Sequence, residues 1–323
     1  MALGLGKVKL NCKRCGGVEV VKAGFYKNRN GTVQRHACRG CGRTFSLSNN
    51  NGMRVEREKI AQVIRLLCES SGIRSAQRIT GLHQETILKI LKVAGRLSAR
   101  YMCDKVRGVR SPVIQVDEMH SIVHTKQYNT TPGPEAKKHG NQFTFLSICR
   151  DTRLIVNTLT GPRTTANAVI FLRRLRERAA GRFQLCTDAW NVYRGSRSAV
   201  RSVFGKEVDH VTEQKVFWKP SEFLPRELTR LIRTPRIGQP DVALASTAHV
   251  ERLNLTLRQF NRRLARCTLG FSKKLLNLRY SVSLFAWHYN FARKHGTLGT
   301  SPGVASDIRP DIMSVFELLE YKG

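Results

Sequence analysis

Acidic residues are scarce in this chain. Its 23 Asp and Glu stand against 56 Lys and Arg, which gives a formal net charge of +33 at pH 7. An excess of this size is larger than solubility requires. It is typical of proteins that bind a polyanion, because neutralising phosphates with Lys and Arg releases counterions. Nucleic acid is the partner that this composition favours, and a ribosome-associated or membrane-surface protein is the alternative.

Long apolar runs are also missing. No stretch approaches the roughly 18 to 20 apolar residues that cross a bilayer, which excludes a membrane-spanning protein. No basic amphipathic helix with an exposed aromatic face stands out, which argues against a membrane-surface protein. The N-terminal residues MALGLGKVKLNCKRC lack the apolar core and cleavage site of a secretory signal. We therefore expect a soluble, cytosolic protein, and its 323 residues are enough for two or three domains.

Four of the cysteines form a regular pattern near the N-terminus. Two CxxC pairs, Cys12 with Cys15 and Cys38 with Cys41, are separated by 22 residues. This spacing predicts a structural zinc site, because four thiolates leave no open position for a substrate. Glycines beside both pairs allow the backbone to turn tightly around the metal. Two disulfides are the alternative, which a cytosolic location disfavours.

The residues between the two CxxC pairs read as short strands around an Asn30-Gly31 turn, which is a good hairpin signal. Together with the cysteines they predict a zinc ribbon over residues 1–48 that presents a basic surface. We interpret the other five cysteines as packing residues. These are Cys68, Cys103, Cys149, Cys186 and Cys267.

A helical region follows the polar stretch from Ser46 to Gly52. Apolar residues recur at helical spacing in VEREKIAQVIRLLCESSG and in QETILKILKVAGRL, with a short segment and a turn at Gly81 between them. This order fits a helix-turn-helix DNA-binding domain over residues 53–104, and a plain three-helix linker domain is the alternative. If DNA is read, we expect the helix from Gln84 to Arg96 to enter the major groove. The candidate contacts are Gln84, Thr86, Lys89 and Lys92.

Beyond Pro112 the sequence changes to apolar, β-branched runs. VIQVD and FQLCTD read as strands that end in acids, with two more strands and a helix from Thr165 to Ala180 between them. This order predicts a mixed α/β sheet. Neighbouring strands that end in Asp117 and Asp188 would bring two carboxylates together, and such a pair favours a divalent cation such as magnesium. Periodicity alone leaves open whether Asp117 or Glu118 is the ligand, because adjacent strand residues point to opposite faces.

One isolated acid is the candidate for a third ligand. From Ser246 to His295 there are ten Lys or Arg and a single carboxylate, Glu251. On a helix, the apolar residues from Leu253 to Leu264 form a buried stripe, and Glu251 lies roughly opposite, on the same face as Arg258 and Arg262. A solvated helix face accounts for exposed charges, but it does not predict one acid among so many bases. We therefore expect Glu251 to share its surface with two candidate DNA-binding residues, Arg258 and Arg262.

These motifs resemble a known family. VDEMHSIV, CTDAWNVY, ASTAHVERLNLTLRQFNRRLARCTLGFSKK and HYNFARKHGTLGTSP are similar to transposases of the insertion sequence one type, over a region from the zinc ribbon to about Pro302. The resemblance implies an RNase H-like catalytic domain over residues 111–302, with an Asp-Asp-Glu triad at Asp117, Asp188 and Glu251. It thereby selects Asp117 over Glu118. His120 is a departure, because family members commonly have an aromatic residue there.

The same resemblance implies the reaction and the partners. Two Mg or Mn ions held by the triad would support cleavage at the ends of a mobile element and attack of the freed 3′-OH on target DNA. The expected partners are double-stranded DNA, as terminal inverted repeats and as target, and at least one further copy of the chain to pair two ends. We expect the protein to associate with the nucleoid.

Two other functions are compatible with this reading. One is a DNA-binding regulator with an idle catalytic domain, although the presence of all three acids argues against it. The other is a structure-specific nuclease of the same fold, and fold alone does not separate these functions. Residues 219–239 combine prolines with arginines and are either a DNA-embracing segment or a surface insertion. Residues 303–323 read as a mildly acidic tail.

Overall fold

The computed structural model describes residues 11–322, except residues 13, 29–30, 47–52, 54, 132, 134–135, 219–226 and 267. The chain divides into two compact units, Met1–Ala61 and Gln62–Gly323, and the boundary falls inside helix α1 (Arg57–Cys68). The division into residues 1–48, 53–104, 111–302 and 303–323 stays a prediction, and residues 47–52 of the expected linker lie outside the described residues. No helix in the described part of the chain is long and apolar enough to span a bilayer.

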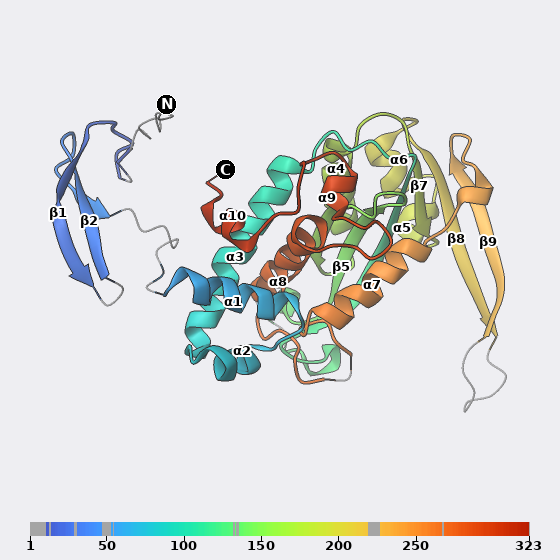
Figure 1. Cartoon of the computed structure of the whole chain (residues 1–323). Helices are drawn as coiled ribbons and strands as arrows, with labels where there is room; N and C mark the ends of the chain where they lie inside the picture. The colour runs from blue at the N-terminus through green and yellow to red at the C-terminus, as the bar shows by residue number, and fades with distance from the viewer. Residues whose placement is uncertain are drawn as a thin grey trace. The chain divides into compact units, whose positions relative to one another are not determined.

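The strands described in the first unit form one antiparallel sheet (Figure 1). β1 (Val20–Asn28) pairs with β2 (Gly31–Cys38), and β2 pairs with β3 (Thr44–Ser46). The predicted hairpin is therefore confirmed, although Asn30 of its turn lies outside the described residues. A bulge interrupts β1 near Gly24, whose φ of +77° is unfavourable for a residue with a Cβ.

The helices that the apolar spacing predicts are present. After α1 come α2 (Ile73–Thr80) and α3 (Gln84–Lys105). Gly81 ends α2 with a left-handed φ of +69° and donates its N–H to the carbonyl oxygen of Gln77. α3 continues past Arg96, where the sequence pattern ended, because its buried face extends to Tyr101 and Met102.

A six-stranded mixed sheet forms the centre of the second unit, which confirms the predicted mixed α/β class. The strand order is β6-β5-β4-β7-β8-β9, in which β7 is parallel to both of its neighbours and the other pairs are antiparallel. The strands are β4 (Val113–Val123), β5 (Gly140–Cys149), β6 (Ile155–Gly161), β7 (Gln184–Asp188), β8 (Asp209–Trp218) and β9 (Glu227–Ile237).

β8 and β9 were not predicted as strands. β9 is the edge strand, and it can therefore carry Pro235 and three arginines, which a central strand would not tolerate. Arg230 is exposed, and Arg233 and Arg236 are half-buried. Its mixed composition hides the alternation that a half-buried strand normally shows. Residues 219–226 of the same predicted segment lie outside the described residues.

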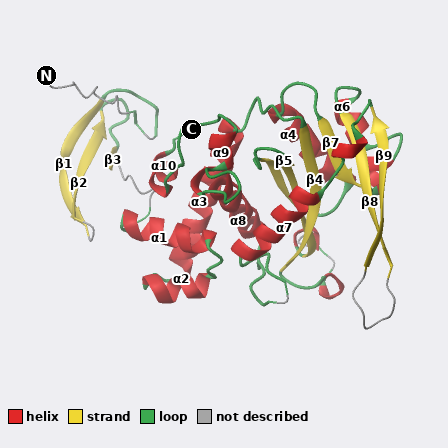
Figure 2. Ribbon diagram, turned by 45° about the vertical axis from the view of Figure 1, so that its right-hand side comes forward, coloured by secondary structure: helices red, strands yellow, loops and turns green. Residues whose placement is uncertain are grey.

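Helices cover both faces of this sheet (Figure 2). α7 (Ala248–Phe260) packs against β4 and β5, and α4 (Thr165–Arg178) packs against β5 and β6 on the other face. α8 (Leu275–Trp287) contacts β6 and α3, and a π-helical turn (His288–Ala292) follows it directly. The remaining short helices are α5 (Asn191–Arg194), α6 (Ala199–Phe204), α9 (Pro302–Ala305) and α10 (Val315–Glu320).

α7 is shorter than its apolar stripe suggests. It ends at Phe260, so Arg262 and Leu264 lie beyond the helix, and the expectation that Arg262 shares a helix face with Glu251 is wrong. The reason is the buried residue Asn261, whose side-chain oxygen accepts hydrogen bonds from the N–H of Arg263 at 3.2 Å and the hydroxyl of Ser281 at 3.0 Å. These bonds fix a turn where the sequence periodicity would allow another helical turn.

We expect Gly95→Ala to destabilise the protein by roughly 1–3 kcal/mol. A Cβ at Gly95 would lie 2.7 Å from both the Cα and the carbonyl oxygen of Tyr280 in α8. Backbone atoms cannot rotate away, so this clash outweighs the gain of about 1 kcal/mol in helix propensity. Thermal unfolding measures the effect. Gly195→Ala, whose Cβ would approach no atom closer than 3.9 Å, is the control. An unchanged melting temperature for Gly95→Ala would contradict the close approach of α3 and α8.

Candidate functional site

The predicted cluster of four cysteines is confirmed. The Sγ atoms of Cys12 and Cys41 are 3.6 Å apart, as are those of Cys15 and Cys38, and all four lie within 4.8 Å of one another. Ligands about 2.3 Å from a tetrahedral zinc ion are about 3.8 Å from each other, so the sulfurs fit one ion. A disulfide would need about 2.05 Å, and all four cysteines are free. The cluster could therefore hold a structural metal such as zinc.

Two of the four glycines beside these cysteines have the role that the sequence indicates. Gly16 and Gly42 have φ values of +73° and +67°, in the left-handed region that favours glycine. Gly16 donates its N–H to the carbonyl oxygen of Cys12, and Gly42 donates to that of Cys38, both at 2.9 Å. Each CxxC pair thus forms a tight turn that directs its sulfurs inward.

Asp117 does not end its strand, which corrects the sequence prediction. β4 continues to Val123, and Asp117 lies in its middle. The parallel pairing of β4 with β7, however, stops at Gln115 and Cys186. Asp117 and Asp188 each follow two residues later, on the same side of their strands as the last pair. The two aspartates thus lie where the strands diverge, although β4 continues along its other neighbour, β5.

Glu118 lies on the opposite face from Asp117. Its side chain is fully buried and forms an ion pair with Arg163, at 2.9 Å between Oε2 and Nη2, and a hydrogen bond with the hydroxyl of Tyr193. Burial, and then repulsion from Asp188, raises the pKa of Glu118 to about 7. Arg163 also contacts Asp188 at 3.3 Å, so it bridges the two acids. Asp117 instead accepts a hydrogen bond from Asn254 of α7 at 2.7 Å.

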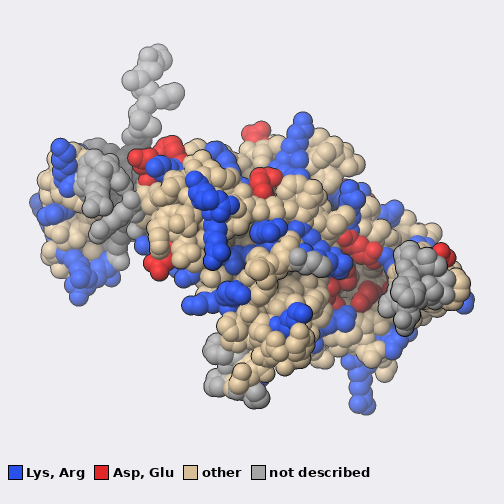
Figure 3. All heavy atoms as spheres, turned by 90° about the horizontal axis from the view of Figure 1, so that it is seen from below, with Lys and Arg blue, Asp and Glu red and all other residues tan. Residues whose placement is uncertain are grey.

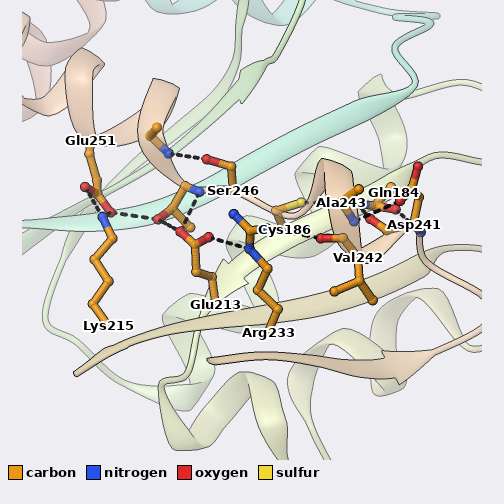
Figure 4. A network of polar contacts seen from close by, with 12 residues as sticks. Gln184, Cys186, Glu213, Lys215, Arg233, Asp241, Val242, Ala243, Ser246 and Glu251 are labelled. Carbon is orange, nitrogen blue, oxygen red and sulfur yellow. Dashed lines mark hydrogen bonds and ion pairs between the residues drawn. The ribbon is translucent and has the colours of Figure 1, made fainter. Parts of the chain in front are cut away.

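Glu251 lies in the first turn of α7 and faces β8. It forms an ion pair with Lys215 of β8 and accepts a hydrogen bond from the hydroxyl of Thr247 at 2.7 Å. Figure 4 shows the side chains of Lys215 and Glu251 pointing toward one another. A basic strand residue thus occupies the position next to the isolated acid.

Glu213 is a fourth acid that the sequence analysis missed. It pairs with Asp188 in the register of β7 and β8, and its side chain is only 4% exposed. It forms an ion pair with Arg233 of β9 at 3.1 Å, and it accepts hydrogen bonds from both the N–H and the hydroxyl of Thr247 (Figure 4). Recognising β8 as a strand would have placed Glu213 and Lys215 on one face.

Side chains from the sheet satisfy the free N–H groups at the start of α7. Oε1 of Gln115, in β4, accepts from His249 at 2.9 Å and from Val250 at 3.0 Å. The hydroxyl of Ser246 accepts from Ala248 at 3.1 Å, and Glu213 accepts from Thr247. A helix leaves its first N–H groups without internal partners, so these bonds fix where α7 begins. Since Gln115 and Asp117 lie on one face of β4, the same bonds set the position of Glu251 relative to Asp117.

We expect Gln115→Leu to destabilise the protein by roughly 1–3 kcal/mol, because it leaves two N–H groups at the start of α7, one of them buried, without an acceptor. Gln115 is fully buried, so water cannot replace it. Urea unfolding measures the loss, and Gln239→Leu, at an exposed position, is the control. If both variants unfolded at the wild-type urea concentration, the side chain of Gln115 would not be what fixes α7.

The acids influence one another electrostatically. Burial raises the pKa of Asp117 to about 6, and repulsion from Asp188 and then from Glu251 adds to the rise. Burial also raises the pKa of Asp188, against the effect of Arg163. Among the described residues, the cysteines are the only ligand group within 4.8 Å, so the three acids are spaced more widely than the four sulfurs. Their oxygen donors, and the repulsion that Asp188 and Glu251 exert on Asp117, nevertheless suit a hard divalent cation.

Three of the acids, but not Asp117, border a hollow in the surface. Asp188, Glu213 and Glu251 line a space of about 370 Å³, together with Arg163 and Lys215. Figure 3 shows Asp and Glu side chains gathered in a hollow on a face that is otherwise rich in Lys and Arg. The Lys and Arg side chains around the hollow would attract a negatively charged ligand, and the acids inside it could bind a metal ion.

The candidate DNA contacts have different surroundings. On α3, Gln84, Lys89 and Lys92 are exposed and Thr86 is half-buried. Arg258 is half-buried in the last turn of α7. Burial and then the charge of Arg266 lower its pKa, and the charge of Asp117 opposes this effect. Arg262 is exposed beyond the end of α7. All six residues stay predictions as DNA contacts.

Comparisons with known proteins add little to this picture. No protein-family model matches the chain, and no curated protein matches it. Among solved structures, it is similar to a chain in a cryo-electron microscopy structure of the simian T-cell lymphotropic virus intasome in complex with the PP2A regulatory subunit B56 gamma. The identity is 13%, the TM-score is 0.36, and the match covers 76% of this chain and 74% of that chain. A likeness this weak supports no argument about function.

Proposed function

We propose that this chain is a DNA transposase of the insertion sequence one type, which cuts and joins DNA strands at the ends of a mobile element. The observation that carries the proposal is the position of Asp117. It lies where two parallel strands diverge, and the charges of Asp188 and Glu251 both act on it. We call Asp117, Asp188 and Glu251 the acidic cluster. The chain as a whole has a net charge of +33, which suits a DNA substrate.

In this proposal Asp117, Asp188 and Glu251 hold divalent Mg or Mn. Two such ions would stabilise the attacking and leaving oxygens of a phosphoryl transfer. The donor set fits, because it consists of carboxylates whose mutual repulsion a cation relieves. Lys215 and Arg163 now pair with Glu251 and Asp188, so each is placed to hold a DNA phosphate when the acids turn to a metal.

The rest of the proposal assigns the other parts of the chain. The second unit would contain an RNase H-like catalytic domain. The four-cysteine unit would be a zinc ribbon and α1 to α3 a helix-turn-helix, and both would bind the terminal inverted repeats. Exposed Lys89 and Lys92 on α3 support this assignment for the helices. Pairing two element ends would require at least a homodimer.

A cleavage and joining assay tests the proposal. Purified protein is incubated with Mg or Mn, a labelled duplex carrying the inverted repeats that flank the gene, and a target plasmid. We expect 3′-end cleavage followed by insertion of the labelled end into the plasmid. Cleavage of branched DNA without joining would instead identify a structure-specific nuclease, and binding of the repeats with neither product would identify a regulator.

A further inference from the structure

A second hollow lies beside α7, separate from the acidic one. It has a volume of about 450 Å³ and shares no lining residue with the hollow that contains Glu251. We call it the cationic pocket, after the six basic side chains in its lining. These are Arg153, His249, Arg252, Arg293, Lys294 and His295.

The lining of the cationic pocket contains no carboxylate. In the part of the chain that the structure describes, none of its Arg or Lys side chains forms an ion pair. Asp151 is the acid whose charge reaches His249, and it is exposed. Burial and then the charge of Arg153 lower the pKa of both His249 and His295. Among the described residues, the Arg and Lys side chains of this pocket are therefore without an ion-pair partner.

The wall formed by Arg293 is held in place by the fold. The π-helical turn after α8 closes with a bond from the N–H of Arg293 to the carbonyl oxygen of His288 at 2.8 Å. Within that turn, Asn290 is fully buried and bonds to both the N–H and the carbonyl oxygen of Ile155 in β6, at 2.9 and 2.8 Å. The guanidinium of Arg293 then lies 3.7 Å from the ring centroid of Phe260 in α7. π-helical turns are frequent at functional sites.

Two polar atoms of this wall lack a partner. Nη1 of Arg293 and Nδ1 of His295 are buried and make no hydrogen bond with any residue that the structure describes. Burying a guanidinium N–H without an acceptor is unfavourable, and a ligand that supplies acceptors would remove that cost. The guanidinium of Arg293 can only donate, so the missing group there is a hydrogen-bond acceptor, and the surrounding Arg and Lys side chains favour an acceptor that carries negative charge.

We propose that the cationic pocket binds a phosphate group. A guanidinium presents its donors in a planar fork that suits a phosphate, and ammonium and imidazole groups complete a tetrahedral anion's coordination from other sides. The pocket is too small for a duplex, so it would take one phosphate of a DNA backbone or a free phosphate. The proposal goes beyond the transposase function, because it requires neither the acidic cluster nor a metal.

The test compares two double variants of the full chain. Arg252→Gln with Lys294→Gln removes two exposed cations of the pocket, and Arg173→Gln with Arg197→Gln removes the same charge at exposed positions outside it. Inorganic phosphate is titrated by calorimetry at constant ionic strength, without divalent metal. We expect the pocket variant to bind phosphate at least about tenfold more weakly than wild type, while the control variant binds as wild type does.

A second arm identifies the source of the phosphate. Binding of a short DNA duplex is measured over a series of salt concentrations. If the pocket holds a backbone phosphate, the slope of log affinity against log salt becomes shallower by about one in the pocket variant relative to the control variant. An unchanged slope with weakened phosphate binding identifies a free phosphate.

The proposal is overturned if the pocket variant and the control variant match in both arms. Circular dichroism checks that both variants fold, and Arg252→Gln alone replaces the double variant if the latter melts early. Neither arm measures strand cleavage, so a negative result here is independent of the transposase proposal, and failure of cleavage leaves the pocket proposal standing.

Discussion

Asp117→Asn should reduce metal-dependent DNA cleavage by at least roughly 10³-fold, the scale expected when a group that stabilises transition-state charge is lost. The substitution removes the carboxylate on which both Asp188 and Glu251 act, but it keeps an oxygen that can accept the bond from Asn254. The fold should therefore survive. Rates of 3′-end cleavage under single-turnover conditions measure the loss.

Two further variants sharpen this prediction. Asp311→Asn removes an exposed acid outside the acidic cluster and should cleave at the wild-type rate. Glu118→Gln alters the neighbour on the opposite face, which is held by Arg163 and Tyr193, and should lose much less activity than Asp117→Asn. A large loss for Glu118→Gln with a small one for Asp117→Asn would reverse the assignment of the ligand.

The Asp117→Asn variant should also become more stable relative to wild type as the pH rises. The pKa of Asp117 is raised from 3.8 to about 6, so the folded protein holds a proton that the unfolded chain has lost in this window. Wild-type stability therefore falls between about pH 4 and pH 6, on the order of 3 kcal/mol from this group, and the variant lacks that loss because its amide does not titrate. Urea unfolding in a chelator measures the difference between the two proteins. A difference that is constant with pH would contradict the raised pKa.

Cys38→Ser should abolish zinc binding and unfold the first unit. Cys38 is 1% exposed, and its sulfur is 3.6 Å from that of Cys15, so a serine oxygen there would leave one ligand too few. Zinc contributes roughly 10–16 kcal/mol to the folding of comparable small sites, far more than three short strands supply. We expect one zinc per wild-type chain by elemental analysis, and none in the variant.

Hydrogen exchange locates the effect. Amides of β1 to β3 should lose protection in Cys38→Ser, whereas those of the six-stranded sheet should keep theirs, because the two sheets belong to separate compact units. Cys103→Ser changes a cysteine outside the cluster and should retain the metal. Stoichiometric zinc in Cys38→Ser would show that the four sulfurs are not the ligand set.

Local patterns were sufficient for much of this architecture. The two CxxC pairs predicted the cysteine cluster, because each pair forms its own turn. The helical spacing around Ile87 and Leu91 predicted α3, because both residues are buried on one side of it. The structure differs from the sequence prediction at α7, which is shorter, and at β8, which was not predicted, so local patterns were not sufficient there. The stripe toward Leu264 was interrupted by side-chain bonds of Asn261, which no periodicity records.

The candidate site itself needed the three-dimensional arrangement. The sequence marks Asp117, Glu118 and Glu251 as acids next to apolar or basic residues. These neighbours along the chain do not determine which face of β4 packs against α7. That choice is made by contacts between distant segments. His249 donates a hydrogen bond to Gln115, 134 residues away, and Asn254 donates one to Asp117, 137 residues away. The sequence alone determined which residues are charged, which cysteines could bind a metal and which segments form helices. The packing of α7 against the sheet then selected which acids share one electrostatic environment, because that depends on register and burial rather than on spacing along the chain.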